Sequence, residues 1–209
     1  MDSGEIEIEA FCRDSNNFEL ALAISKWAEA ERRRLLRSFW ERVREHLRSR
    51  LQGHLSGWKV ELSPEVVKIA HKYSRLAIIP ATAEYEYRAS DSGDWRPAYF
   101  AIVAENLSSR NCYFGIRRGD KAKWGSQLDS TIVSDMRANA FTDKFDSWCG
   151  LKQFDRAGVP NLSPDSIEGA VSLHRAYYDS TGDVIRHVGD LMFDLFERNR
   201  GRLDGLNSP

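Results

Sequence analysis

The feature that most constrains the fold is a long stretch without helix breakers. No glycine or proline occurs between Asn16 and Gln52. A single helix here would be about 50 Å long, so we expect one long helix or two helices with a break near residues 28–34. The stretch has the apolar spacing of three, four or eight residues that is typical of an amphipathic helix, at Leu20, Ile24, Trp27, Leu35, Phe39, Val43, Leu47 and Leu51.

The boundaries of this helix are marked by residues with known preferences. Residues 14–16 (Asp-Ser-Asn) offer short polar side chains that cap helix N-termini. Gly53 and Gly57 favour an end at the other side. Upstream, residues 5–11 (EIEIEAF) alternate charged and apolar side chains, which predicts a half-buried strand. An edge strand or a disordered start is the alternative for that segment.

The middle of the chain predicts an antiparallel sheet. Residues 57–63 alternate, and residues 75–90 contain strand-like runs on either side of Pro80. Residues 63–73 suit either a short helix or a second strand, and residues 91–97 predict a turn. Short polar turns between strands favour antiparallel pairing over βαβ units.

Residues 99–118 are the clearest hairpin, because two aromatic-rich runs flank a polar segment with Ser108, Ser109 and Asn111. Two alternating sets suit a core face: Tyr99, Ala101 and Val103, and Cys112, Phe114 and Ile116.

The C-terminal third predicts mainly helices. Residues 126–141 suit a helix, residues 146–166 a loop with glycines and prolines, and residues 164–199 a helical region that ends at Gly201. The fold class is therefore α+β, with a long N-terminal helix, a central antiparallel sheet and C-terminal helices. We expect a single domain over residues 1–209, with a soft boundary near 120–125 and a frayed tail at 202–209.

Composition argues against several broad classes. The 209 residues carry a net charge of −1, so no global basic field attracts nucleic acid or anionic membranes. No apolar run approaches the ~18 residues of a membrane span, and the acidic start lacks a signal peptide's apolar core. Cys12, Cys112 and Cys149 are far apart and odd in number. Reduced thiols in a cytoplasmic protein are the simplest interpretation.

The most charged segment is residues 31–50, with eight Arg and three Glu. Helical spacing places Arg33, Arg37, Arg44 and Arg48 on one face. The planar guanidinium binds phosphate through paired hydrogen bonds, so residues 32–50 are a candidate contact for nucleic acid. A solvated face offset by the Glu residues, or a face covered by a protein partner, is the alternative.

Carboxylates at strand spacing are the candidates for catalysis. Glu84 and Glu86 would lie on one face of a strand with Arg88, and Glu105 follows the next apolar run. Such carboxylates could hold Mg²⁺ for phosphodiester hydrolysis, or form a charged outer face through cross-strand pairs. The five histidines show no HxxxH or HExxH spacing, and no GxSxG elbow occurs, so no resident metal or other cofactor is expected.

Several short motifs resemble one known family. Phe39-Trp40 lies on the long helix, Tyr113-Phe114-Gly115-Ile116 on a strand, and Trp148 with Phe154 further on. This order is similar to the region downstream of the catalytic core in a bacterial family of the PD-(D/E)XK nuclease superfamily. That superfamily's site takes an Asp, then an acidic-x-Lys motif. Residues 5–11 have no Lys in that place, and residues 84–88 offer Arg88 instead.

The resemblance therefore implies a non-catalytic accessory module of a nuclease-like defence or DNA-processing protein. Two alternatives stay open. One is a divergent Mg²⁺-dependent nuclease that uses Glu84, Glu86 and Glu105. The other is a domain that senses a small ligand or a partner, with a pocket under the hairpin and Trp124.

Overall fold

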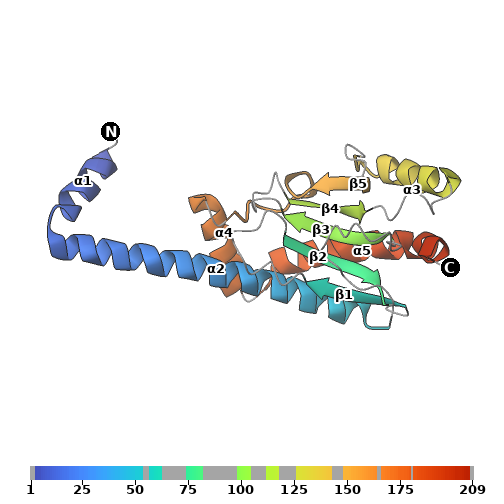
Figure 1. The fold of residues 1–209 in the computed structure, drawn as a ribbon, viewed down its shortest axis with the longest axis horizontal. Helices are drawn as coiled ribbons and strands as arrows, with labels where there is room; N and C mark the ends of the chain where they lie inside the picture. The colour runs from blue at the N-terminus through green and yellow to red at the C-terminus, as the bar shows by residue number, and fades with distance from the viewer. Residues whose placement is uncertain are drawn as a thin grey trace, which may run out of the picture.

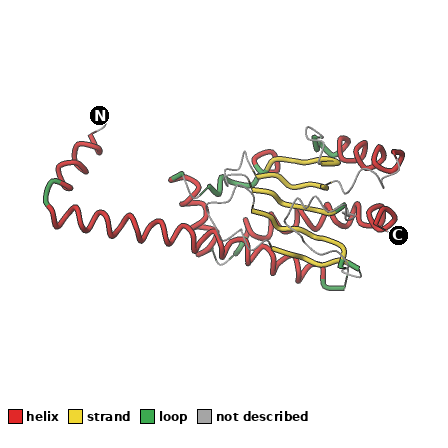
Figure 2. Tube along the Cα trace, viewed as in Figure 1, coloured by secondary structure: helices red, strands yellow, loops and turns green. Residues whose placement is uncertain are grey.

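The computed structural model confirms the α+β arrangement. It describes residues 3–53, 57–62, 74–81, 98–104, 112–117, 126–142, 148–163, 166–179 and 181–207. Figures 1 and 2 show a sheet with helices beside it and a long helix that projects beyond it. The elements are α1 (Ser3–Cys12), α2 (Ser15–Leu51), β1 (Trp58–Leu62), β2 (Ser74–Pro80), β3 (Tyr99–Ala104), β4 (Cys112–Arg117), α3 (Ser126–Ala138), β5 (Trp148–Gln153), the 3₁₀ turn η3 (Asp155–Ala157), α4 (Ile167–Tyr178) and α5 (Asp183–Asn207).

The sheet is an antiparallel meander in the order β1-β2-β3-β4-β5. The predicted hairpin is confirmed, since β3 pairs with β4 and Phe100 lies opposite Ile116. The two predicted sets both contribute to buried faces, but to opposite faces of the sheet. Phe100 and Ile102 of β3 join the main core with β4, whereas Ala101 and Val103 belong to a second buried cluster. Alternation along a strand identifies two faces, but both faces of β3 are buried, so the pattern could not rank them.

Helices α2 and α5 cover the face of the sheet that carries the main core. Aromatic rings join the layers: Phe196 of α5 lies 5.6 Å from Trp58 of β1 and 5.3 Å from Phe100 of β3, measured between ring centroids. The Trp58 indole nitrogen donates a 2.7 Å hydrogen bond to Asp204, also on α5. These contacts attach α5 to the sheet near the C-terminal end of the helix.

The long stretch forms one helix, without the break considered near residues 28–34. Asp14 is its N-cap and accepts hydrogen bonds from the backbone of Asn16 and Asn17. Gly53, with φ of +95°, adopts the left-handed backbone just past the helix end. The buried side chains all lie in the second half, at Leu35, Leu36, Phe39, Trp40, Val43, Leu47 and Leu51.

The strand predicted at residues 5–11 is wrong, because this segment lies within α1. A segment with alternating side chains forms a strand only where it can pair with the edge of a sheet. No described strand pairs with this segment. Its Glu and Ala residues are instead good helix formers.

The loop predicted at residues 146–166 contains strand β5, which pairs with β4. Gly150 lies inside β5, and the presence of glycine led to the prediction of a loop here. A Cβ at Gly150 would lie 2.7 Å from the Cβ of Met136, and one at Gly115 would overlap the Gly150 carbonyl oxygen. Here the glycines let α3 and β4 approach β5 closely, which is not the turn-forming role that the sequence suggested.

The C-terminal helical region is confirmed as two helices, α4 and α5. The predicted end at Gly201 is wrong, because α5 continues to Asn207 and Leu203 is fully buried. The free energy gained by burying Leu203 exceeds the cost of placing glycine inside a helix. The features expected at residues 63–73, 82–97, 105–111 and 118–125 lie outside the described residues.

Candidate functional site

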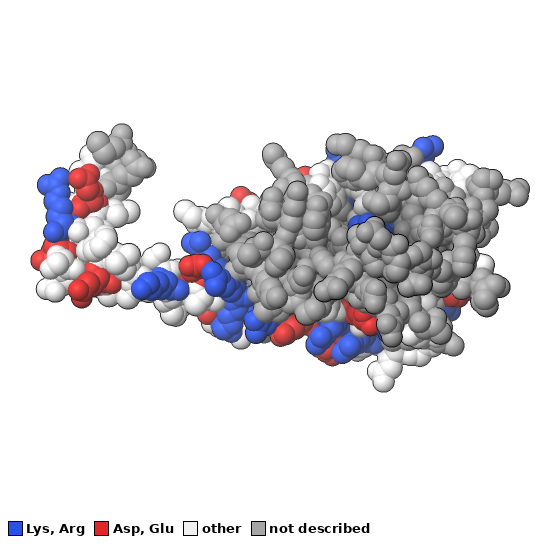
Figure 3. Space-filling model, in the orientation of Figure 1, with Lys and Arg blue, Asp and Glu red and all other residues white. Residues whose placement is uncertain are grey.

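The four predicted arginines share one exposed side of α2. Arg33, Arg37, Arg44 and Arg48 follow each other at spacings of four, seven and four residues, which keeps them in line along a helix. We call this set the Arg face. Figure 3 shows basic side chains along the lower edge of the molecule, interspersed with acidic ones.

Exposed ion pairs partly neutralise the Arg face. Arg33 pairs with Glu29, while Arg44 and Arg48 lie 3.1 and 3.4 Å from the same Glu45 carboxylate. About half of the Arg33 and Arg48 side-chain surface stays exposed, at 54% and 49%. Surface pairs of this kind contribute little to stability, about 0–1 kcal/mol. A phosphate group can therefore compete for these guanidiniums.

A second set of α2 arginines faces the other helices. Arg42 donates hydrogen bonds to the carbonyl oxygens of Ala176 and Tyr177 at the end of α4. Arg34 lies over the Tyr177 ring at 4.5 Å, and Arg50 lies over the Phe193 ring at the same distance. These three residues join α2 to α4 and α5. On the Arg face, Arg48 also donates a 3.5 Å hydrogen bond to the Val60 carbonyl oxygen of β1, so this guanidinium is partly engaged.

Sequence reasoning missed one member of the basic line. Lys26 precedes Arg33 by seven residues and is exposed, so helical spacing places it near the Arg face. Helical spacing could have identified Lys26, but this residue lies outside the Arg-rich segment of residues 31–50.

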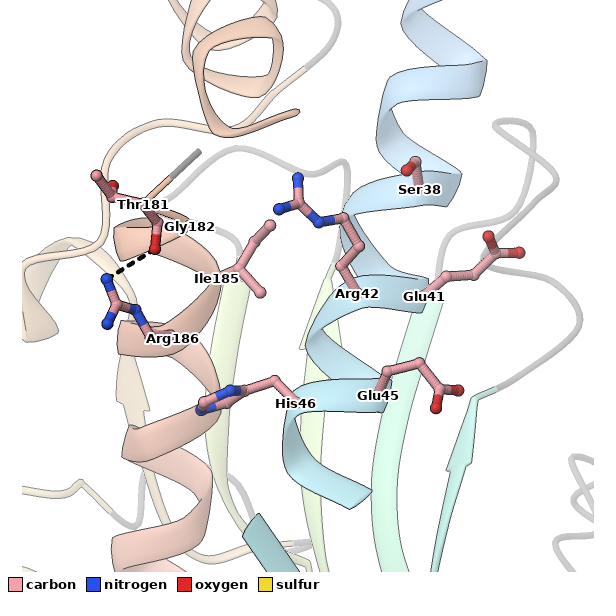
Figure 4. Close-up of a pocket in the computed structure, with 9 residues that line it drawn as sticks. All are labelled: Ser38, Glu41, Arg42, Glu45, His46, Thr181, Gly182, Ile185 and Arg186. Carbon is pink, nitrogen blue, oxygen red and sulfur yellow. Dashed lines mark hydrogen bonds between the residues drawn. The ribbon is translucent and has the colours of Figure 1, made fainter. Parts of the chain in front are cut away.

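A groove of about 420 Å³ opens between α2 and the start of α5. In Figure 4, Arg42 and His46 reach from α2 toward α5, and Arg186 of α5 donates a hydrogen bond to the Thr181 carbonyl. The other lining residues are Ser38, Glu41, Glu45, Gly182 and Ile185. Sequence patterns do not predict this groove, because its two walls are more than 130 residues apart in the chain.

Two polar groups that line the groove are engaged by neighbouring carboxylates. His46 lies 3.1 Å from Asp190, and Gly189 lets this ring pack directly on α5. The Thr181 hydroxyl donates a 2.6 Å hydrogen bond to Asp179, which lowers the pKa of that carboxyl. Acidic and basic side chains are mixed in this groove and are held in structural contacts. The arrangement therefore favours a helix junction over a catalytic site.

The carboxylates of the nuclease alternative, Glu84, Glu86 and Glu105, lie outside the described residues, as does Trp124. Within the described ranges, no group of three or more His, Cys, Asp or Glu side chains is placed to hold a metal ion. Burial raises the pKa of Cys112 to about 12, so this thiol stays protonated at neutral pH.

Trp148, one of the residues that carry the resemblance to the nuclease superfamily, is buried. The Arg117 guanidinium covers its ring at 5.2 Å. Trp148 therefore belongs to the second buried cluster with Ala101, Val103 and Leu151.

No family model, curated protein or solved structure matches this chain. The resemblance to the PD-(D/E)XK superfamily thus remains a prediction. In the part of the chain that the structure describes, no helix has the length and apolar character needed to cross a membrane.

Proposed function

We propose that this protein is a non-catalytic interaction module that contacts the phosphate backbone of nucleic acid through the Arg face of α2. The supporting observation is the division of α2 into two sides. Its core side and its α4-facing side are packed, while Arg33, Arg37 and Arg48 are exposed and Arg44 keeps 30% of its side-chain surface exposed. The resemblance noted above extends the proposal to an accessory part of a nuclease-like defence or DNA-processing protein.

The dimensions of the Arg face suit a nucleic-acid strand. Arg33 and Arg48 are fifteen residues apart, which corresponds to about 22 Å along a helix. Successive phosphates advance about 3.4 Å along a duplex axis, so the face spans about six of them. No base-reading motif accompanies these residues, and we therefore expect binding without sequence preference.

The helix is firmly held at Arg44 and Arg48, the C-terminal half of the Arg face. Val43 and Leu47, on the same turns as Arg44 and Arg48, are fully buried. A rigid scaffold reduces the conformational entropy that binding must overcome, since only the side-chain rotamers remain to be ordered. Affinity would come from charge neutralisation and should depend strongly on salt.

The test is fluorescence anisotropy with a labelled 20-base-pair duplex at low salt. Wild type is compared with a variant in which the four Arg-face residues are Ala. A matched control removes four exposed arginines from η3, α4 and α5: Arg156, Arg175, Arg198 and Arg202. We expect the first variant to lose binding at least tenfold more than the control. Equal losses would mean that net charge, and not the Arg face, attracts the duplex.

A further inference from the structure

The N-terminal part of the molecule has no core of its own. We call α1 together with residues 15–34 of α2 the arm. None of residues 6–34 is buried, and Leu35 is the first buried residue of α2. In Figures 1 and 2 the arm projects away from the sheet, and no other described element lies beside its outer half.

The arm nevertheless carries large apolar side chains. Each of eight such side chains has between 45% and 67% of its surface exposed: Ile6, Ile8, Phe11, Phe18, Leu20, Leu22, Ile24 and Trp27. A helix of about 20 residues without packing is marginal in water, because helical stability in proteins comes mostly from burying an amphipathic face. An apolar arm of this length therefore calls for a covering partner.

Part of the exposed surface continues a face that is covered further along α2. Helical spacing aligns Leu20, Ile24 and Trp27 with Leu35 and Arg42. Leu35 is buried, and Arg42 donates hydrogen bonds to the end of α4. The same side of the helix is thus packed near the sheet and uncovered on the arm.

The charges of the arm indicate which partner would cover it. Residues 5–19 contain five acidic residues and one basic residue, whereas residues 26–34 contain four basic and two acidic residues. Two arms in antiparallel orientation would place the acidic end of each on the basic end of the other. Parallel arms would instead oppose like charges, which destabilises a pair.

We propose that the arm is a dimerisation element, in which two copies of this chain pair their arms antiparallel about a two-fold axis. Such a contact is self-complementary, as two-fold interfaces require. Leu20, Ile24 and Trp27 are each more than half exposed on one side of α2, and they would form the centre of this contact.

Sedimentation equilibrium of the full chain over a concentration series tests the proposal. Wild type should sediment as a dimer. A variant with Leu20→Gln, Ile24→Gln and Trp27→Gln should be a monomer that still unfolds cooperatively in urea, since these side chains contribute nothing to the core. Its far-UV circular dichroism should fall only by the share of the unpaired arm. The control Ile167→Gln with Val171→Gln removes exposed apolar side chains from α4 and should stay dimeric. A monomeric wild type, or a dimeric arm variant, would overturn the proposal.

The orientation is tested separately with a spin label on Cys12. This thiol is partly exposed on α1, whereas Cys112 and Cys149 are buried. Antiparallel arms that cross near Ile24 would hold the two labels about 35 Å apart, at ~1.5 Å per residue. Parallel arms would bring them to about 10 Å, a result that excludes the antiparallel arrangement. The Gln variants leave all charges in place, so a failed dimer and a failed nucleic-acid contact give different results.

Discussion

Phe196 is the side chain whose removal should reveal most about what holds the helices on the sheet. It is fully buried on α5, and its ring packs edge-on against Trp58 and at a steep angle against Phe100. Phe196→Ala removes the apolar surface and leaves a cavity, a change that costs about 3–5 kcal/mol in protein cores. Because two aromatic pairs are lost, each worth about 0.5–1.5 kcal/mol, we expect the upper half of that range, about 4 kcal/mol.

Urea unfolding, followed by circular dichroism and tryptophan fluorescence, measures this loss. With a slope of about 2.5 kcal/mol per M, the midpoint should fall by about 1.6 M. Phe196→Leu keeps most of the volume and should cost about 1–1.5 kcal/mol. Ile167→Ala changes a side chain that is 83% exposed and should alter stability by less than about 0.5 kcal/mol. A loss below about 1 kcal/mol for Phe196→Ala, with an unchanged slope, would refute the proposed helix–sheet junction.

Three further predictions concern other parts of the molecule. Gly150→Ala should destabilise the fold by about 1–3 kcal/mol in urea unfolding, because a Cβ there meets α3. Hydrogen bonds from Thr181 hold the pKa of Asp179 below its usual value, so they stabilise the fold at neutral pH and this contribution disappears as the pH falls through the folded-state pKa. Thr181→Val should raise the pKa of Asp179 in an NMR titration; an unchanged value would contradict the assignment. A thiol reagent should modify Cys12 in the native chain and leave the buried Cys112 unmodified until unfolding.

The fold class was predictable because its main elements carry strong periodic patterns. The amphipathic stripe that ends at Leu51 and the alternation in β1, β3 and β4 each matched one regular structure. The errors arose where local pattern and tertiary packing disagree. Gly150 and Gly201 signalled breaks, yet each lies inside a regular element because neighbouring side chains are buried there.

The site was predictable only in part, for a different reason. Helical spacing alone placed Arg33, Arg37, Arg44 and Arg48 on one side of α2. It could not show that Arg42, on the other side of the helix, is engaged with the end of α4 more than 130 residues later. The exposed state of Trp27 was equally hidden, because the sequence continues the same apolar stripe into the core. Which part of a stripe finds a partner depends on where other elements lie.

The salt dependence of duplex binding tests the central claim most directly. We would measure the dissociation constant of wild type over a salt series, with and without Mg²⁺, and plot its logarithm against that of the salt concentration. Four phosphate contacts predict a slope of magnitude about 3.6 for the association constant. The slope for the Arg-face variant should approach zero. Absence of binding at low salt, or the same slope in both proteins, would contradict the assignment of the Arg face to nucleic acid.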